Sequence, residues 1–263
     1  MNKTICIVIG LLLFVTTGYC QNDNFIIKEI NLEMIKCPAG GFMMGSPKEE
    51  LKRDSFENLH KVTISKDFYI GKYEITQKQY KSIVGQNPSY FKNPNSPVEN
   101  VSWKDANNFC DKLNSKYKDL LPENYKFALP TEAQWEYACR AGTTTTFNNG
   151  KNLSKEYGHC PNLDEVAWYS GNSSYPVGMK KPNSWGIFDM HGNVFEWCRD
   201  GYREYPNGEV IDPIGEIDSS DRILRGGSWR NHTGNCRSAY RFSANIDECS
   251  EYYGFRIALV VIE

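Results

Sequence analysis

Three short stretches of the chain carry spaced apolar positions behind a helix-capping sequence, and they predict three helices. They are TQKQYKSIVG at 76–85, SWKDANNFCDKL at 102–113 and TEAQWEYACRAG at 131–142. Each begins with Ser or Thr and has Gln or Asp three residues later. The hydroxyl can then accept a backbone N–H near the helix start while the later side chain bonds back. Gly85 and Gly142 are stop signals for the first and the third helix.

The third predicted helix places Trp135, Ala138 and Cys139 on one face, because residues three and four apart are neighbours on a helix. An unpaired cysteine on an apolar face behaves as a small hydrophobic residue. We therefore expect Cys139 to belong to the core.

Strand signals along the chain are short. Alternating or apolar runs at 61–76, 126–131, 222–229 and 254–261 predict strands. The last of these ends in the continuous apolar run IALVV, which is typical of a buried strand or its end.

The stretch from Gly142 to about Asp221 has almost no periodicity and is rich in Gly, Asn, Ser, Pro and Tyr. Such a long irregular segment is unusual inside a compact domain, so packed aromatic rings, disulfides or bound ions must order it. No linker or low-complexity tract interrupts the chain after Met34. We predict one domain over residues 34–263 with a loop-rich α+β fold of few helices and short strands.

Charge and composition narrow the classes of function. The formal net charge of -2 offers no strong field to nucleic acid or an anionic membrane, and we expect no nucleic-acid partner. Aromatic residues make up 13%, with 16 Tyr and 6 Trp. Such rings suit peptide or protein recognition, but they also pack the loops of an irregular fold, and composition leaves both interpretations open.

The N-terminus has a lysine near its start, an apolar run and then small residues, which predicts a signal peptide at residues 1–20. Residues 21–33 are polar and predict a loosely held lead-in segment. We therefore expect an exported protein, whether periplasmic, cell-surface or secreted. Acylation of Cys20 would instead anchor the chain to a membrane. No later apolar run reaches the roughly 18 residues that a membrane span needs.

Seven cysteines remain after residue 20 in a compartment where disulfides form. An odd number leaves at least one thiol free or paired between chains. No C-x-x-C spacing is present, which argues against a zinc ribbon or a thioredoxin-type site. The sequence leaves the pairing open. The seven are Cys37, Cys110, Cys139, Cys160, Cys198, Cys236 and Cys249.

Eight segments in series give the chain a resemblance to a known family. They are GGFMMGS, FYIGKYEITQKQY, SPVENVSWKDANNFC, ALPTEAQWEYACRAG, PVGMKKPNSWGIFDMHGNVFEW, RILRGGSW, NCRSAYR and YGFRIAL. In this order, over nearly all of residues 36–260, the chain resembles the sulfatase-modifying-factor family, whose founding members are formylglycine-generating enzymes. The resemblance implies a variant of the C-type lectin fold, which agrees with the irregular α+β fold expected from the pattern.

Active members of that family carry two cysteines, five residues apart, after a Gly-Gly-Ser turn. The pair binds Cu(I), and a substrate cysteine in a sulfatase peptide becomes formylglycine. Here the second position is Cys236 and the first is Asn231, whose amide oxygen is a hard ligand and not a thiolate. The resemblance therefore implies a copper site that this loop alone does not complete. His232 together with Cys236 is the pair that could still hold copper.

The resemblance also marks other residues around this loop. It implies catalytic positions at Cys236 and Ser228 and substrate-binding positions at Trp197, Asn235 and Arg237. Arg237 can pair with the carboxylates or backbone oxygens of a peptide. It can equally be a buried ion-pair partner that holds loops together.

The loop HGNVFEW is the second feature that the resemblance marks, as a calcium site. Side-chain oxygens of Asn193 and Glu196, with the carbonyls of Gly192 and Val194, suit a hard cation. A capped turn in which Glu196 forms a salt bridge explains the same residues.

Two functional hypotheses follow from the missing first thiolate. We expect an exported family member that lacks copper-dependent formylglycine-generating activity and acts as a binding or structural module with a peptide or protein partner. The alternative, which the retained Cys236 favours, is an active oxidase that converts a substrate cysteine to formylglycine in sulfatase maturation.

Overall fold

The computed structural model describes residues 24–155 and 158–262. The predicted signal peptide and Cys20 lie outside these residues. Within them, no helix has both the length and the apolar character needed to cross a membrane.

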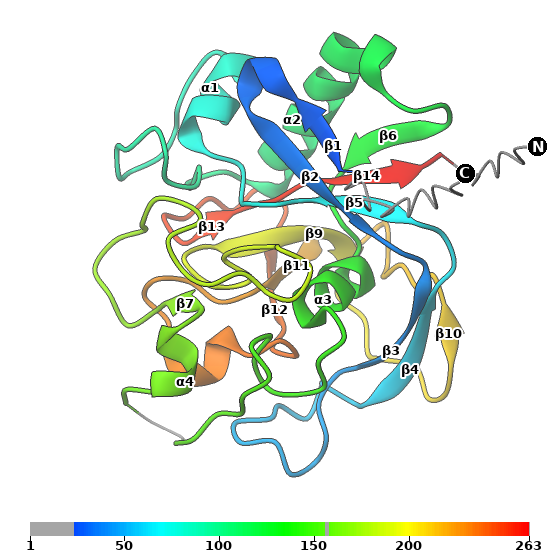
Figure 1. The fold of residues 1–263 in the computed structure, drawn as a ribbon, viewed down its shortest axis with the longest axis vertical. Helices are drawn as coiled ribbons and strands as arrows, with labels where there is room; N and C mark the ends of the chain where they lie inside the picture. The colour runs from blue at the N-terminus through cyan, green and yellow to red at the C-terminus, as the bar shows by residue number, and fades with distance from the viewer. Residues whose placement is uncertain (1–23, 156–157, 263) are drawn as a thin grey trace, which may run out of the picture.

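An antiparallel sheet of five strands holds both ends of the described chain (Figure 1). Its order is β1 (Phe25–Ile27), β2 (Leu32–Cys37), β5 (Phe68–Gly71), β14 (Ala258–Val261) and β6 (Tyr125–Ala128). Ile27 and Leu32 are buried in its core. Residues 25–33 are therefore part of the domain, and the expected boundary at residue 34 is placed too late. The apolar run near the C-terminus is a buried strand, as predicted.

A second sheet of four strands crosses the middle of the molecule (Figure 1). Its order is β12 (Phe242–Asn245), β11 (Asp221–Arg225), β9 (Phe195–Gly201) and β13 (Tyr253–Gly254). The pattern did not predict β9, because its Glu196 and Asp200 are buried along with its apolar residues and no alternation results.

Two smaller pairings complete the strands. A three-stranded sheet has the order β10 (Val210–Ile211), β4 (His60–Ile64) and β3 (Gly40–Met44), and β7 (Ala167–Trp168) pairs with β8 (His191–Gly192). Strands β7, β8, β9 and β10, with a short helix α4 (Pro161–Asp164), fall in the stretch that has no sequence periodicity, and they leave most of it irregular.

The three predicted helices are confirmed, and each starts at its predicted cap. They are α1 (Gln77–Val84), α2 (Trp103–Tyr117) and α3 (Glu132–Arg140), and a short α4 (Pro161–Asp164) and three 3-10 turns, η1 (Lys28–Ile30), η2 (Lys118–Leu120) and η3 (Thr233–Cys236), are added. Thr76, Ser102 and Thr131 all form complete capping boxes. The hydroxyl and the third side chain satisfy N–H groups that the first helical turn leaves unpaired.

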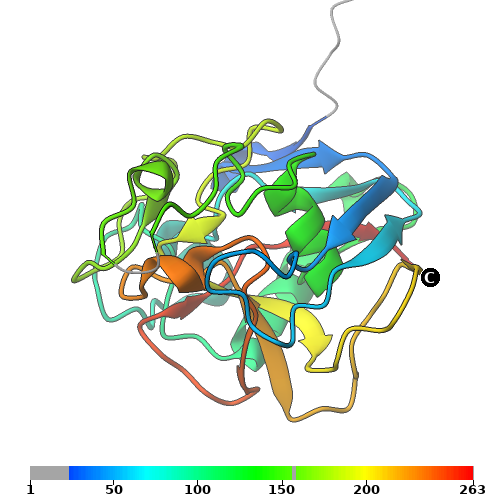
Figure 2. The same cartoon turned by 90° about the horizontal axis from the view of Figure 1, so that it is seen from below.

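Helix α3 lies near the centre of the molecule, between the strands of different sheets (Figure 2). It packs against β3, β4, β9 and β11, with Trp135 and Cys139 fully buried, so the expected core role of Cys139 is confirmed. A separate core between α1, α2 and the five-stranded sheet contains Phe109, Leu113 and Phe255. All seven cysteines in the described residues are unpaired, so no disulfide joins the irregular loops in this structure.

Candidate functional site

The turn that follows β11 packs directly against the segment that contains Asn231 and Cys236, residues 231–238, which we call the cysteine loop. Gly226 and Gly227 have φ values of 92° and 76°, a conformation that glycine adopts without strain. A Cβ added to Gly227 would lie 2.7 Å from the Sγ of Cys236, and one added to Gly226 would lie 3.2 Å from Trp135. The two glycines therefore let the backbone close over the thiol.

Cys236 is enclosed beneath this turn. Its side chain is fully buried and packs in a small apolar cluster with Phe147 and Leu163. Burial raises the pKa of the thiol to about 12. The protonated thiol is a poor nucleophile and a poor metal ligand, because both roles require the thiolate.

A buried histidine holds the backbone of this loop. His191 Nδ1 lies 2.8 Å from the carbonyl oxygen of Cys236, and the Asn148 backbone N–H donates to Nε2 at 3.0 Å. Since the carbonyl can only accept, Nδ1 carries the proton and the ring is neutral. Burial lowers the pKa of His191 to about 4. The imidazole thus joins the loop before Gly150 to the cysteine loop and has a structural role.

Asn231 stands where active relatives are expected to have a thiolate, and its side chain is already engaged. Its Oδ1 accepts the Ser228 backbone N–H at 3.0 Å and the Ser228 hydroxyl at 2.5 Å. The amide oxygen therefore fastens the Gly-Gly-Ser turn, and the hydroxyl is committed as a donor. His232 is exposed whereas Cys236 is buried. The residues present do not fit a two-coordinate Cu(I) site.

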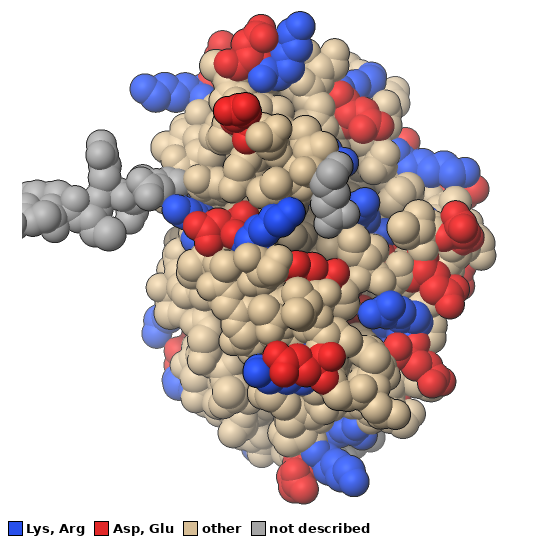
Figure 3. Space-filling model, turned by 90° about the vertical axis from the view of Figure 1, so that its right-hand side faces the viewer, with Lys and Arg blue, Asp and Glu red and all other residues tan. Residues whose placement is uncertain are grey.

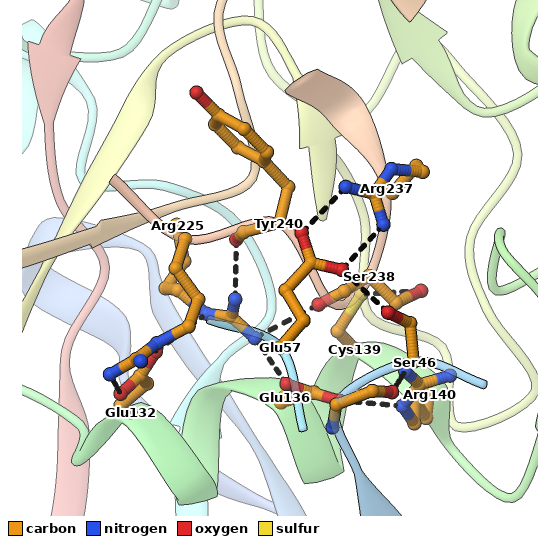
Figure 4. Close-up of polar contacts among 12 residues, drawn as sticks. Ser46, Glu57, Glu132, Glu136, Cys139, Arg140, Arg225, Arg237, Ser238 and Tyr240 are labelled. Atoms are coloured by element: carbon orange, nitrogen blue, oxygen red, sulfur yellow. Dashed lines mark hydrogen bonds and ion pairs between the residues drawn. The ribbon is translucent and has the colours of Figure 1, made fainter. Parts of the chain in front are cut away.

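Of the three expected substrate-binding residues, two are enclosed. Arg237 is fully buried, and its guanidinium donates to both carboxylate oxygens of Glu57 at 2.6 and 2.7 Å (Figure 4). A further bond of 2.8 Å joins it to Glu50. Trp197 is fully buried and donates to a backbone carbonyl, while Asn235 is half-buried. Arg237 holds the loop to Glu57, Trp197 belongs to the core beside Tyr253, and both are enclosed in the protein.

A network of buried ion pairs extends below the loop (Figure 4). Arg225 pairs with Glu136 and donates to the Ser238 carbonyl at 2.9 Å, while Arg140 bonds the other oxygen of Glu136 at 2.8 Å. Leaving one partner of such a pair alone costs about 3–5 kcal/mol. The network therefore fixes the path of the chain after β11, and its ion pairs do not involve Asn231 or Cys236.

Glu132, at the start of α3, belongs to the same network. Arg241 holds its carboxylate through two bonds of 2.7 and 2.9 Å. Burial alone would raise the pKa of Glu132, but Arg241 and Arg225 lower it below its ordinary value. This carboxylate is therefore held ionised inside the protein by arginine.

The loop expected to bind calcium has its side-chain oxygens occupied. Arg256 binds both carboxylate oxygens of Glu196 at 2.6 Å, and Trp135 donates to one of them at 2.7 Å. The Oδ1 of Asn193 accepts the Tyr175 backbone N–H at 2.9 Å. The salt-bridged arrangement is the one formed here, and in this conformation the two side chains do not fit a calcium site.

Two buried acids beside this loop have no counterpart in the sequence-based expectations. Glu74 accepts from the Asn193 side chain at 2.6 Å, and burial with nearby Asp189 raises its pKa well above the ordinary value. Asp189 accepts the Gly178 N–H with one oxygen, and its other oxygen, Oδ1, is buried without a hydrogen-bond partner. Burial raises the pKa of Asp189 to about 6. No local sequence pattern predicts that Glu74 and Asp189 lie close together, because they are far apart in the chain and only the fold brings them together.

Aromatic side chains surround the Gly-Gly-Ser turn at the surface. Trp229 packs edge-on against Phe91 with ring centroids 5.5 Å apart and against Tyr252 at 5.2 Å. Tyr90, 74% exposed, contacts Phe91, and Arg230 donates to the Tyr252 hydroxyl at 2.8 Å. We call these five residues the aromatic patch. The sequence indicated only an excess of rings, not their position.

The fold and this site define a class of protein: a lectin-type α+β domain whose Gly-Gly-Ser turn closes over a cysteine loop held by buried arginines. The chain belongs to the family of the sulfatase-modifying factor enzyme 1-like domain, which matches residues 27–261. This confirms the family and the fold expected from the sequence motifs.

Two curated relatives represent different named roles. The chaperone protein LppX of Paenibacillus barcinonensis is 33% identical over 234 residues, covering 70% of this chain and 77% of that protein. The formylglycine-generating enzyme of Mus musculus is 25% identical over 290 aligned residues, covering 86% of this chain and 74% of the enzyme. Membership of the family therefore does not decide the activity.

Two solved structures share the fold over nearly their whole length. Variable protein 1 of Treponema denticola has a TM-score of 0.78 at 28% identity and covers 89% of this chain and 97% of its own. PvdO from Pseudomonas aeruginosa also has a TM-score of 0.78 at 28% identity, covering 91% and 98%. The fold is thus common to proteins with different names.

Proposed function

We propose that the protein is an exported, non-oxidising member of its family that binds a peptide or protein partner on the aromatic patch. The observation that carries the proposal is the state of the cysteine loop. Cys236 is a buried, protonated thiol, and Asn231 is committed to Ser228. A Cu(I) ion would need a second soft donor and an open path to the first.

The aromatic patch supplies the chemistry for recognition. Aromatic residues and arginine are enriched at protein interfaces, and tyrosine and tryptophan rings bury a large area with little loss of conformational freedom. Tyr90 and Arg230 are exposed, while Trp229 below them is fixed by packing and by a bond to the Glu251 carbonyl at 3.1 Å. A rigid base beside one exposed ring and an exposed guanidinium is the arrangement expected of a binding surface.

The two curated relatives support different candidates. The name of the LppX relative describes a chaperone, a role that requires contact with another protein and no oxidation. The mouse relative is named as the enzyme, which keeps the oxidase as the alternative. The enclosed thiol favours the chaperone-like candidate.

Copper binding separates the two functions. The mature protein and Cys236→Ser are titrated with Cu(I) against a chromogenic chelator, and both are then incubated with a cysteine-containing sulfatase peptide and oxygen. We expect no copper retained against the chelator and no aldehyde on the peptide. Stoichiometric copper that is lost in Cys236→Ser, together with aldehyde formation, would establish the oxidase instead.

Peptide selection tests the binding surface. Peptides enriched on the immobilised mature protein are measured against Tyr90→Ala and Tyr252→Ala, with Phe56→Ala as a matched control because Phe56 is also exposed but lies outside the patch. We expect affinity to fall in the two patch variants and to persist in the control. Equal affinity in all three would remove the patch from the proposal.

A further inference from the structure

A cavity of about 280 Å³ lies at the opposite end of α3 from the cysteine loop. Thr131 and Gln134, at the N-terminal end of the helix, line it, whereas Cys139 near the C-terminal end contacts Ser238. A helix rises 1.5 Å per residue, so the nine residues of α3 separate the two places by about 12 Å. The cavity is therefore distinct from the site described above, and we call it the basic pocket.

The floor of the basic pocket is apolar and comes from the two sheets that meet at this end. Ile64 at the end of β4, Phe68 of β5, Val260 of β14 and Leu129 after β6 line it. All four are nearly or fully buried. A floor built from sheet residues is rigid, so the pocket does not depend on the position of a mobile loop.

Three basic side chains stand around this floor. Lys66, Lys126 and Arg199 line the pocket, and within the described part of the chain their side chains make no hydrogen bond or ion pair with another residue. Figure 3 shows acidic and basic side chains interspersed over the face that carries β10 and the end of the chain, with no continuous patch of either sign. The cluster of cations is thus a local property of the pocket.

The acidic side chains that also line the basic pocket are already engaged. Asp67 accepts the Ala39 N–H at 2.8 Å and pairs with Lys36 at 3.3 Å. Asp212 accepts the Ser65 N–H at 2.8 Å. Lys36 balances the charge of Asp67, whereas Asp212 keeps its own charge because its partner Ser65 is neutral. Lys66, Lys126 and Arg199 therefore exceed the acidic charge at the pocket, in a protein whose formal net charge is -2.

A second cavity of about 200 Å³ continues the basic pocket past Lys126 and Arg199, which line both. Arg222 lines this second cavity and lies over the Trp103 ring at 4.7 Å. It is 6% exposed, yet its Nε has no hydrogen-bond partner. Its other guanidinium nitrogens donate to the carbonyls of Ser219 and Ile217, so Arg222 adds a fixed positive charge to the wall of this second cavity.

We propose that the basic pocket binds a small organic anion, with the negative group held between Arg199 and the two lysines and an apolar body on the sheet floor. Hydrogen bonds between cations and an oxyanion are stronger than neutral ones, and the arginine fork fits carboxylate and phosphate alike. Ile64, Phe68 and Leu129 are already covered, so the apolar contact comes from Val260 and from the partly buried Val261 and Ile214, which also line the pocket. The two cavities together reach the size range of small-ligand sites.

Titration calorimetry with defined probes tests this proposal on the full mature chain. The probes are phenyl phosphate and phenylacetate, which share a ring and differ in the acid, together with benzyl alcohol and inorganic phosphate as the uncharged and the non-apolar comparisons. We expect both aromatic anions to bind and both comparison probes to bind at least about tenfold more weakly. Preference for one aromatic anion identifies the acid.

Variants locate the binding. Arg199→Gln and Lys126→Gln should each weaken the aromatic anions by about tenfold or more, a loss of one charged hydrogen bond. Lys78→Gln, at an exposed lysine of α1 outside the pocket, should leave affinity unchanged, and so should Tyr252→Ala in the aromatic patch. Equal binding of benzyl alcohol, or anion binding that survives both pocket variants, would overturn the proposal. The unfolding midpoint of each variant confirms that it is folded.

Discussion

Replacing Asp189 by Asn tests whether burial controls the charge beside the expected calcium loop. The substitution keeps the shape of the side chain and an oxygen for the Gly178 N–H, which donates to Asp189 at 2.6 Å. Asp189 has a φ of 55°, and Asn adopts this left-handed conformation as readily as Asp. The exchange therefore removes a charge with little change to the backbone.

The expected magnitude follows from the pKa of Asp189, which burial raises from 3.8 to about 6. A raised acid pKa means that folding favours the protonated form, so this contribution to stability is complete below pH 3.8 and is lost as the pH rises through 6. A shift of one pKa unit corresponds to about 1.4 kcal/mol. The free energy of unfolding of Asp189→Asn, relative to that of the wild type, should thus increase by about 2–3 kcal/mol when the pH rises from 4 to 7.

Neighbouring Glu74 acts in the same direction. The negative charge of Asp189 contributes to the raised pKa of Glu74, so its removal lets Glu74 ionise at a smaller cost. The predicted gain of the variant at neutral pH therefore includes a contribution from a second carboxyl, and its sign is unchanged.

Urea unfolding followed by tryptophan fluorescence, repeated at intervals between pH 4 and 7, measures the difference. Asp212→Asn is the matched control, because Asp212 also has a positive φ, of 44°, but is exposed. A difference between Asp189→Asn and wild type that is constant over this range would refute the reasoning, and so would a relative gain by the wild type as the pH rises.

Three further substitutions test the support of the cysteine loop. Arg237→Ala leaves Glu57 buried without its partner and should lower the free energy of unfolding by about 3–5 kcal/mol, measured by urea titration; a loss below 1 kcal/mol would contradict a buried pair. Gly227→Ala should lower the thermal midpoint more than Gly85→Ala, whose φ is also positive but whose surroundings are open; equal losses would mean that contact with the thiol is unimportant. The wild type should lose stability on acidification from pH 6.5 to 4, because the folded pKa of His191 is about 4, and His191→Asn should show a smaller loss over this range. The same loss in both proteins would contradict a neutral His191 ring.

Local chemistry explains what the sequence could predict of the fold. The caps at Thr76, Ser102 and Thr131 depend on residues three positions apart, so the pattern alone located the starts of all three long helices. Strand β9 was missed because its Glu196 is neutralised by Arg256, sixty positions away. A charge whose partner is distant in sequence looks like a solvent-exposed residue.

The same limit applies to the site. Spacing after the Gly-Gly-Ser turn placed Asn231 and Cys236 correctly in one loop, because the chain there is continuous. It could not show that the Arg237 guanidinium is paired with the carboxylate of Glu57, 180 positions earlier in the chain. The basic pocket likewise joins Lys66, Lys126 and Arg199 from three separate strands or turns, and no motif relates them.

The position of the ion pairs explains how the loop keeps its shape with Asn231 at the position where the family resemblance implies a thiolate. Arg225 and Arg237 hold the loop through carboxylates and backbone carbonyls of other elements, and neither contact involves residue 231. The Asn231 amide then adds its own bonds to Ser228 in place of a coordination bond. Stability of the loop is therefore separable from its chemistry, and Asn231→Cys should fold while losing about 1–2 kcal/mol with those two hydrogen bonds. If that variant unfolds, the amide and not the arginines would be the main support of the loop.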